Sequence, residues 1–333
     1  MSETATINIA MVGPRGVGKT SLLAAMYNEL DPEVRSIGCN LTMEAGTTTT
    51  AITDRLGELK SLGDKSSIVV QNNEGIDNTS DFREYTFHLD IGDGGLPEVT
   101  LRFMDMPGDW YCGKGDFKRA DEAIQQSHIS FLAVDATALM EAPSKSDGGM
   151  GKYHGIINQP LQIREAYKRA LRKFGNGHLV VVTLIRAETY VKAGRIDDLY
   201  RQVRLAYGDL ASCMQEVPVF ACYVETVGSL LFNSFTKEGE HVISRFRRAP
   251  GKKYAPQRCA LPLRLAIHEG LAHAVQNASK AVSETDSFFN DVLEFFGVQT
   301  NHSEAMAKHA RTQAIFEEIS SRLKPADFIK LSA

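Results

Sequence analysis

Four short runs of apolar, mostly β-branched residues alternate along the chain with stretches whose apolar residues recur at helical spacing. The runs predict strands at residues 7–12, 129–134, 179–185 and 217–223. The stretches predict helices from about residue 21, at about 160–174 and at about 195–213. Strands that alternate with helices in this way are typical of a largely parallel sheet with helices on both faces, so the sequence predicts an α/β fold.

Between the first two of these strands the pattern changes to strict alternation. Apolar and polar residues alternate over 82–91, a glycine-rich turn follows at 92–95, and a second apolar run covers 99–104. This arrangement predicts a β-hairpin that adds one antiparallel strand to the sheet. Ahead of the hairpin, apolar residues at helical spacing predict an additional helix at about 51–62.

The last third of the chain has a different character. Residues 245–258 carry six Lys or Arg residues and no acid, and Pro250, Gly251 and Pro256 predict irregular structure there. This stretch is either a flexible basic arm for an acidic partner or, as we favour, a solvated loop. Beyond residue 260 the pattern is helical. We therefore expect a domain at 1–240, a basic linker or loop at 241–260, and a helical C-terminal extension at 261–333 packed on the same domain.

Composition and charge exclude several classes of protein. Of the 333 residues, 43% are hydrophobic and 23% are charged, values that allow a buried core and exclude global disorder. The net charge of −4 leaves no chain-wide basic surface, so nucleic acid is not an expected partner. The five cysteines form no C-x-x-C pair, and neither a signal peptide nor a transmembrane run is present. We therefore expect a cytoplasmic protein with reduced thiols.

The strongest chemical signal lies between the first strand and the first helix. Residues Gly13–Thr20 match the phosphate-binding pattern G-x-x-x-x-G-K-[ST] without a mismatch. In this pattern glycines turn backbone N–H groups toward phosphate oxygens, Lys19 binds the β- and γ-phosphates, and the Thr20 hydroxyl binds Mg²⁺. The expected nucleotide-binding residues here are Gly13, Pro14, Arg15, Gly16, Val17, Gly18, Lys19, Thr20 and Ser21.

A second phosphate element ends the second strand of the hairpin. Asp105-Met106-Pro107-Gly108 forms a D-x-P-G turn, in which the carboxylate of Asp105 can hold Mg²⁺ and the Gly108 N–H can contact a γ-phosphate. The alternative is an ordinary β-turn with proline and glycine in their usual places. The position after the phosphate loop and the hairpin favours the first interpretation.

Together these motifs resemble the translation-factor-like (TRAFAC) branch of P-loop GTPases over roughly residues 5–235. The resemblance implies a P-loop NTPase fold and a Mg²⁺-dependent protein that binds and hydrolyses GTP. It also implies a threonine that binds Mg²⁺ just before the first hairpin strand. Thr79 is our choice for this residue, and Ser80 and the run Thr47–Thr50 are its rivals.

The base-recognition motif departs from the family pattern. The family has N-K-x-D or T-K-x-D where this chain has Ile185-Arg186-Ala187-Glu188. The resemblance implies that Arg186 replaces the lysine that packs over the base and that Glu188 replaces the aspartate that reads guanine, whereas Ile185 cannot copy the asparagine. GTP is therefore the expected ligand, and ATP is not excluded. The usual Ser-Ala-Lys is also missing from Tyr223–Gly228.

The turn, the altered base motif and the Val224–Gly228 stretch also resemble the double-GTPase proteins of bacterial conflict systems. This resemblance implies a protein partner, either a second GTPase-like protein or an effector, and allows homo- or hetero-oligomers. Asp109 stands where many relatives have the glutamine that orients water, so slow turnover is expected. Arg15 is a candidate cis arginine finger, or else it points to solvent or pairs with an acid. The alternatives are a P-loop ATPase or a nucleotide-binding module with little or no hydrolysis.

Overall fold

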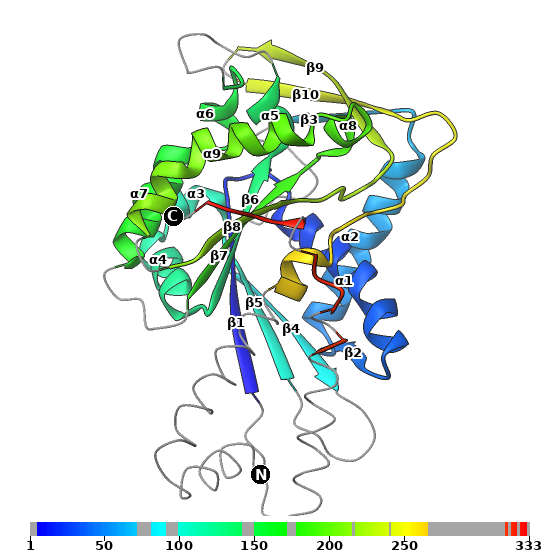
Figure 1. The fold of residues 1–333 in the computed structure, drawn as a ribbon, viewed down its shortest axis with the longest axis vertical. Coiled ribbons are helices and arrows are strands. Elements are labelled where there is room, and N and C mark those ends of the chain that lie inside the picture. Colours follow the sequence, from blue (N-terminus) through cyan, green and yellow to red (C-terminus); the bar gives the residue numbers. More distant parts are fainter. Residues whose placement is uncertain are drawn as a thin grey trace, which may run out of the picture.

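The computed structural model describes residues 5–71, 81–90, 99–141, 150–171, 178–214, 217–239, 241–265, 317–318, 321–324 and 327–331. Its main feature is an eight-stranded sheet with the order β11-β8-β7-β6-β1-β5-β4-β2 (Figure 1). Five neighbouring strands run parallel: β8 (Val219–Tyr223), β7 (Leu179–Ile185), β6 (Ile129–Asp135), β1 (Ala5–Val12) and β5 (Val99–Asp105). The predicted mixed α/β fold with a mostly parallel sheet is confirmed.

The predicted hairpin is also present. Strand β4 (Arg83–Asp90) pairs antiparallel with β5, and Arg83 lies opposite Asp105. Two further antiparallel strands close the edges of the sheet, which the sequence patterns did not reveal. They are β2 (Asn40–Met43), which pairs with β4, and β11 (Ile329–Lys330), which pairs with β8.

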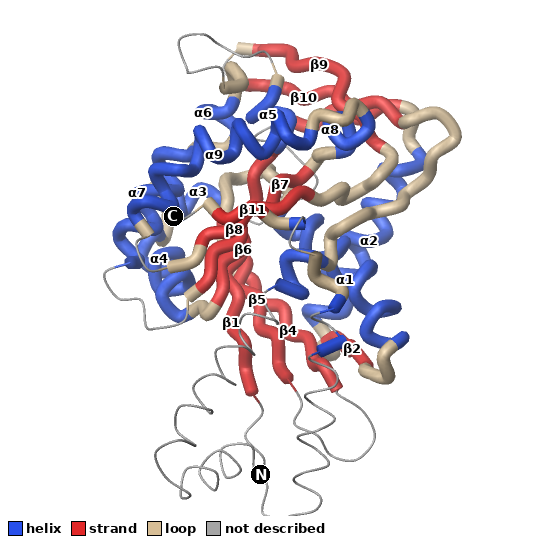
Figure 2. The backbone as a smooth tube through the Cα atoms, in the orientation of Figure 1, coloured by secondary structure: helices blue, strands red, loops and turns tan. Residues whose placement is uncertain are grey.

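Helices cover both faces of the central sheet (Figures 1 and 2). On one side lie α1 (Lys19–Ser36) and α2 (Thr47–Asp64), and on the other lie α4 (Phe117–Gln126), α7 (Pro160–Leu171) and α9 (Ile196–Cys213). Alternate residues of β1 point to opposite sides, because successive side chains of a strand do so. Ile9 and Met11 pack in the core under α1, and Ala10 and Val12 pack in the core under α7 and α9.

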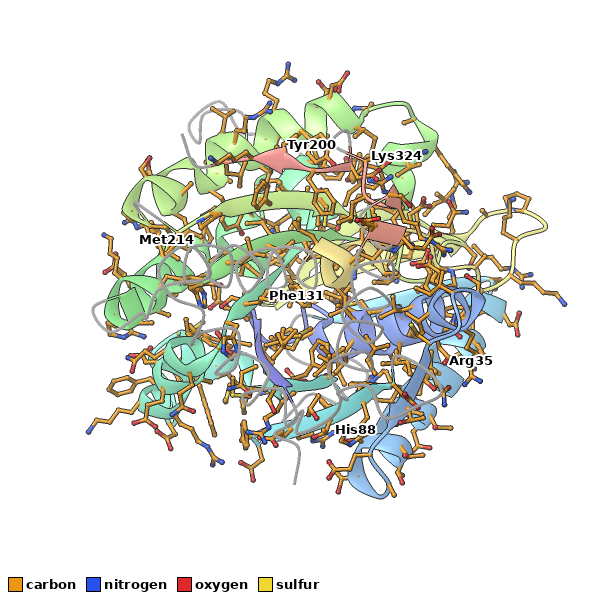
Figure 3. All side chains as sticks on the ribbon, turned by 60° about the horizontal axis from the view of Figure 1, so that its bottom comes forward. Arg35, His88, Phe131, Tyr200, Met214 and Lys324 are labelled. Carbon is orange, nitrogen blue, oxygen red and sulfur yellow. The ribbon has the colours of Figure 1, made fainter. Side chains whose placement is uncertain are left out.

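Both cores are mostly apolar at the middle of the sheet, where Ser130 of β6 and Thr183 of β7 are buried polar residues. Every residue of β6 and of β7 is buried, as expected for parallel strands covered on two faces. Phe131 of β6 lies near the centre of the molecule (Figure 3), and its ring centroid is 6.4 Å from that of Phe103. Phe103 in turn meets Phe87 edge to face at 5.4 Å.

A second, three-stranded antiparallel sheet has the order β3-β10-β9, formed by β3 (Ser67–Gln71), β10 (His241–Arg248) and β9 (Leu230–Glu238). It lies near the short helices α5 (Ala136–Met140), α6 (His154–Ile157) and α8 (Glu188–Lys192) (Figure 1). This sheet corrects the prediction that the basic stretch from residue 241 is irregular. Val242, Ser244 and Phe246 are buried at a period of two, Ile243 between them is buried as well, and Arg245 and Arg247 are more exposed. The charges hid this strand periodicity.

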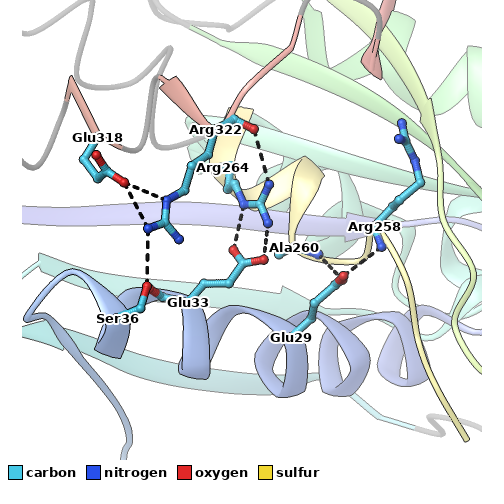
Figure 4. A network of polar contacts seen from close by, with 8 residues as sticks. All are labelled: Glu29, Glu33, Ser36, Arg258, Ala260, Arg264, Glu318 and Arg322. Atoms are coloured by element: carbon cyan, nitrogen blue, oxygen red, sulfur yellow. Dashed lines mark hydrogen bonds and ion pairs between the residues drawn. The ribbon is translucent and has the colours of Figure 1, made fainter.

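The chain beyond the second sheet returns to the outer face of α1. Glu29 accepts hydrogen bonds from the backbone N–H groups of Arg258 and Ala260, at 2.8 and 2.9 Å. One turn further along the helix, Glu33 forms an ion pair with Arg264 (Figure 4). The last described residues also reach this region, because Arg322 donates to Ser36 and Arg258 pairs with Asp327 at 2.8 Å.

Residues 266–316, where most of the C-terminal helices are predicted, lie outside the described residues, so the division into 1–240, 241–260 and 261–333 stays a prediction. The described part contains no helix with the length and apolar character needed to span a membrane.

Candidate functional site

The loop of residues 13–20 connects β1 to α1 and has the backbone of a phosphate-binding turn. Gly13, Gly16 and Gly18 have φ values of 146°, 73° and 108°, which residues with side chains rarely adopt. A Cβ on Gly13 would also be crowded, because it would lie 3.0 Å from the carbonyl oxygen of Ala133. The glycines are therefore required by the path of the chain.

Lys19 lies beneath this loop. Its Nζ donates to the carbonyl oxygens of Gly13 and Pro14, at 3.0 and 3.3 Å. Burial lowers the pKa of Lys19, and the negative charges of Asp105 and Asp109 oppose that shift. The ammonium group thus sits inside the turn, where it can reach an anion held by the loop.

Thr20 and Asp105 meet directly beside the loop. Asp105 is the last residue of β5, where it lies opposite Met11 of β1, so the parallel pairing brings it to the carboxyl end of β1. The Thr20 hydroxyl donates to Oδ2 of Asp105 at 2.7 Å. A hydroxyl and a carboxylate side by side are the hard oxygen donors that Mg²⁺ prefers, so these residues fit the expected metal.

The D-x-P-G turn packs tightly on the 13–20 loop. A Cβ on Gly108 would lie 1.9 Å from the backbone nitrogen of Arg15 and 2.2 Å from the carbonyl carbon of Pro14. Only glycine fits such a close approach of two backbones. Tyr111 of helix α3 (Gly108–Tyr111) fixes the turn by donating from its hydroxyl to the carbonyl oxygen of Met11 at 3.0 Å. The structure therefore brings the two predicted phosphate elements together.

Arg15 and Asp109 form an ion pair across this junction, with 3.5 Å between Nη1 and Oδ2. Their side chains are 44% and 41% exposed. Three orientations were expected for the Arg15 side chain: over the phosphates, toward solvent, or paired with a nearby acid. The structure shows the third of these.

Arg186 lies at the carboxyl end of β7 and contacts three other parts of the molecule. Its guanidinium forms an ion pair with Asp135, donates to the carbonyl oxygen of Gly16 at 3.4 Å, and lies 5.6 Å from the centre of the Phe246 ring. Ile185 packs on the same loop, since its Cδ1 would be 3.2 Å from a Cβ on Gly18. The expected role of Arg186 over a base stays a prediction.

Glu188 is buried and supports the turn after β8. Its Oε1 accepts from the backbone N–H groups of Val227 and Gly228, at 3.2 and 3.1 Å. Burial raises the pKa of Glu188 to about 7, although these two hydrogen bonds oppose the shift. Reading of guanine by Glu188 stays a prediction as well.

The choice of a metal-binding threonine remains open. Thr79 and Ser80 lie outside the described residues. In the rival run, Thr48 accepts from the Thr86 N–H at 3.1 Å and Thr49 donates to the Glu44 carbonyl at 2.9 Å. These two hydroxyls therefore anchor the start of α2.

Sequence reasoning missed Asp135 and its neighbours. Asp135 ends β6 and caps α5, and Asn158 both donates to its carbonyl and accepts from its N–H. His154 lies next to Asn158, and burial lowers its pKa to about 4. An aspartate at the carboxyl end of a buried strand was the one available signal for this cluster.

The chain matches no protein-family model, and no curated protein sequence matches it. Two solved structures of the Saccharomyces cerevisiae Ski7 GTPase-like domain are similar to it, one bound to GDP and inorganic phosphate and the other bound to GTP. Their sequence identities are 12% and 13%, and their TM-scores are 0.32 and 0.34. Each similarity covers 66% of this chain and 43% of the Ski7 chain. Values this low carry no argument about function, which depends on the chain's own residues.

Proposed function

We propose that this protein is a P-loop GTPase of the translation-factor-like type, which binds and hydrolyses GTP with Mg²⁺ and acts as a switch. The observation that carries the proposal is the packing of the D-x-P-G turn on the 13–20 loop. This packing places Lys19, Thr20, Asp105 and the Gly108 N–H around one small region. Each of these groups suits a different part of a magnesium–triphosphate.

The roles follow from the chemistry of each group. The loop N–H groups and the start of α1 bind phosphate oxygens, since a helix N-terminus favours anions. Lys19 would add a positive charge, and the Gly108 N–H would donate to the terminal phosphate. Thr20 and Asp105 would hold Mg²⁺, with Thr79 as the proposed third residue. Mg²⁺, when bound, would neutralise charge on the β- and γ-phosphate oxygens.

Hydrolysis would depend on Asp109, the residue after Gly108. An aspartate is shorter than the glutamine of many relatives, and here it is paired with Arg15. We therefore propose slow intrinsic turnover that a partner accelerates. The same pairing favours the second candidate function, a module that holds a nucleotide with little hydrolysis.

The finer parts of the proposal rest on the sequence resemblance. The altered base motif and the Val224–Gly228 stretch support a regulatory component of a bacterial conflict or defence system. A second GTPase-like protein or an effector would be its partner, in the cytoplasm. GTP is the proposed ligand and ATP the competitor.

Titration with fluorescent GTP and ATP analogues, with and without Mg²⁺, tests the proposal. We expect Mg²⁺-dependent binding that favours the guanine nucleotide, and phosphate release at a slow but measurable rate. Binding without phosphate release would leave the second candidate function, and a preference for ATP would indicate a P-loop ATPase. Failure to bind either triphosphate would contradict the proposal.

A further inference from the structure

We propose that Arg186 is a positioning residue that ties the 13–20 loop to the second sheet, and that it does not pack over the base. The inference rests on the proposed function where it is tested by triphosphate binding. Its second test, hydrogen exchange of the nucleotide-free protein, depends on the structure alone. The inference concerns the base end of the same site, where the sequence departs from the family pattern.

The backbone of Arg186 gives the first indication. Its φ of 60° lies in the left-handed region, which a residue with a side chain adopts only when its surroundings require it. This conformation occurs directly after β7, at the carboxyl edge of the central sheet. The guanidinium at this position makes contacts with three other parts of the molecule.

The carboxylate of Asp135 is held in an orientation that lets it bind the guanidinium. Its Oδ1 caps α5 by accepting from the N–H groups of Thr137 and Ala138, at 2.8 and 3.1 Å, and from the Thr137 hydroxyl. Its Oδ2 faces Arg186. Asn158 holds the backbone of Asp135 on both sides of the residue. The carboxylate is buried and cannot rotate without breaking the cap, so it fixes the guanidinium in one place.

The remaining contacts of the guanidinium join two separate parts of the fold. Nη2 donates to the carbonyl oxygen of Gly16 in the 13–20 loop, and the ring of Phe246 in β10 lies beside the guanidinium carbon at 5.6 Å. Phe246 is itself buried. Thr189 of α8, three residues after Arg186, also accepts from the Phe232 N–H of β9 at 2.7 Å. The second sheet is thus attached to the loop through the segment that follows β7.

The guanidinium contacts a carboxylate, a carbonyl oxygen and an aromatic ring of the protein itself. These contacts position the 13–20 loop and do not require a nucleotide base. Loss of the guanidinium should loosen the 13–20 loop around Gly16 and weaken binding of every ligand that the loop holds. The contribution of Arg186 to binding is therefore expected to be the same for every triphosphate, whatever base it carries.

The test compares Arg186→Ala with the wild type for three probes: GTP, ATP and inorganic tripolyphosphate, each with Mg²⁺. We expect affinity to fall by about tenfold or more for all three probes, by the same factor within about twofold, as for loss of one charge-assisted contact. Arg186→Lys should recover part of the loss only, because an ammonium cannot contact Asp135 and Gly16 in the fork geometry of a guanidinium. A loss for GTP that is absent for tripolyphosphate would overturn the proposal, since it would place Arg186 on the base.

Hydrogen exchange of the nucleotide-free protein provides a readout that does not depend on binding. The backbone N–H groups of residues 16–18 should exchange faster in Arg186→Ala and in Asp135→Asn than in the wild type. Arg169→Ala is the matched control, because Arg169 also pairs with an aspartate, Asp121, at 2.8 and 3.0 Å, but between α4 and α7. The control should leave exchange at 16–18 unchanged.

Unchanged exchange at 16–18 in both Arg186→Ala and Asp135→Asn would refute the positioning role even if GTP binding is confirmed. Faster exchange in a protein that binds no triphosphate would refute the proposed function and keep the structural link. Should Arg186→Ala fail to fold, Phe246→Leu removes one contact and leaves the ion pair. It should speed exchange at 16–18 to a smaller extent, and no change would count against the link to the second sheet.

Discussion

At the phosphate end of the candidate site, the proposed binding groups are backbone N–H groups and a few side chains from one loop and the strand beside it. At the base end, the polar side chains come from β6, from α6 and the residue after it, from the residue after β7, and from α8, and they are bound to one another and to the backbone. Lys19 and Thr20 follow Gly18 directly in the chain, whereas Asp135 and Arg186 are 51 residues apart.

The difference shows how each end tolerates sequence change. A turn that binds phosphate through its backbone needs glycines at fixed positions, so its pattern is visible in a single sequence. Where ion pairs between side chains support the structure, the paired residues can be replaced by other pairs while the fold is kept. Here Arg186 and Glu188, the two residues predicted to contact a base, instead support the fold through an ion pair with Asp135 and hydrogen bonds to the backbone.

The largest effect is expected from Lys19→Ala, which removes the main charge at the phosphate end. Losing charge-assisted hydrogen bonds to two phosphates should weaken triphosphate binding by about 10³-fold, or about 4 kcal/mol. The thermal unfolding midpoint should change little, because the hydrogen bonds of the ammonium that the structure describes join it to two carbonyl groups of its own loop. Calorimetric titration and a thermal melt measure the two quantities, and unchanged affinity would remove the central proposal.

At the base end, Glu188→Gln should change the pH dependence of stability. Burial raises the pKa of Glu188 from 4.5 to about 7 in the folded protein. The folded state therefore favours the protonated form, and the wild type should lose stability as the pH rises from about 4.5 to about 7. The full loss is on the order of 3–4 kcal/mol, from about 1.4 kcal/mol per pKa unit.

Glutamine keeps an oxygen that can accept from Val227 and Gly228 but does not titrate, so the variant should lack this loss. Urea unfolding at several pH values measures it. Glu84→Gln is the control, since Glu84 is exposed on β4. Parallel pH profiles for Glu188→Gln and the wild type would show that Glu188 does not titrate in this range.

The difference between the phosphate end and the base end also explains what could be predicted from the sequence. The strands, the hairpin and the contact between the two phosphate elements follow from local patterns and from the order of parallel strands, and the structure agrees with them. Strand β10 was missed because Arg245, Arg247 and Arg248 concealed its period of two. Asp135 was missed because its partner, Arg186, follows another strand, and pairing between distant segments has no signal in one sequence.

A third prediction concerns Asp105, which is buried at the phosphate end. Asp105→Asn should weaken Mg²⁺-dependent binding of triphosphate more than that of diphosphate, because the carboxylate would help to hold the metal between the β- and γ-phosphates. Loss of a residue that holds the metal through water typically costs about 10–100-fold in metal affinity. Titration of GTP and GDP over a range of Mg²⁺ concentrations measures the difference. Equal losses for the two nucleotides would indicate that Asp105 supports only the Thr20 hydroxyl.

The smallest effect is expected from Arg15→Ala, which tests whether the junction between the two phosphate elements takes part in the reaction. The Arg15–Asp109 pair is about half exposed, so its loss should change the free energy of unfolding by less than about 1 kcal/mol. Triphosphate affinity should stay within a few-fold of the wild type, because the loop N–H groups and Lys19 remain.

Turnover should fall by about tenfold, well below the 10³–10⁵ of a fully ordered arginine finger, because the guanidinium must first leave Asp109 to reach the γ-phosphate. Arg15→Lys separates charge from geometry, since it keeps a positive charge beside Asp109 without the forked donors. Single-turnover phosphate release for the three proteins measures the step directly. If Arg15→Ala turns over as fast as the wild type or faster, Arg15 is not a finger. Its remaining effect would then be steric, because the side chain of Arg15 would obstruct an arginine that a partner inserts at the phosphate end of the site.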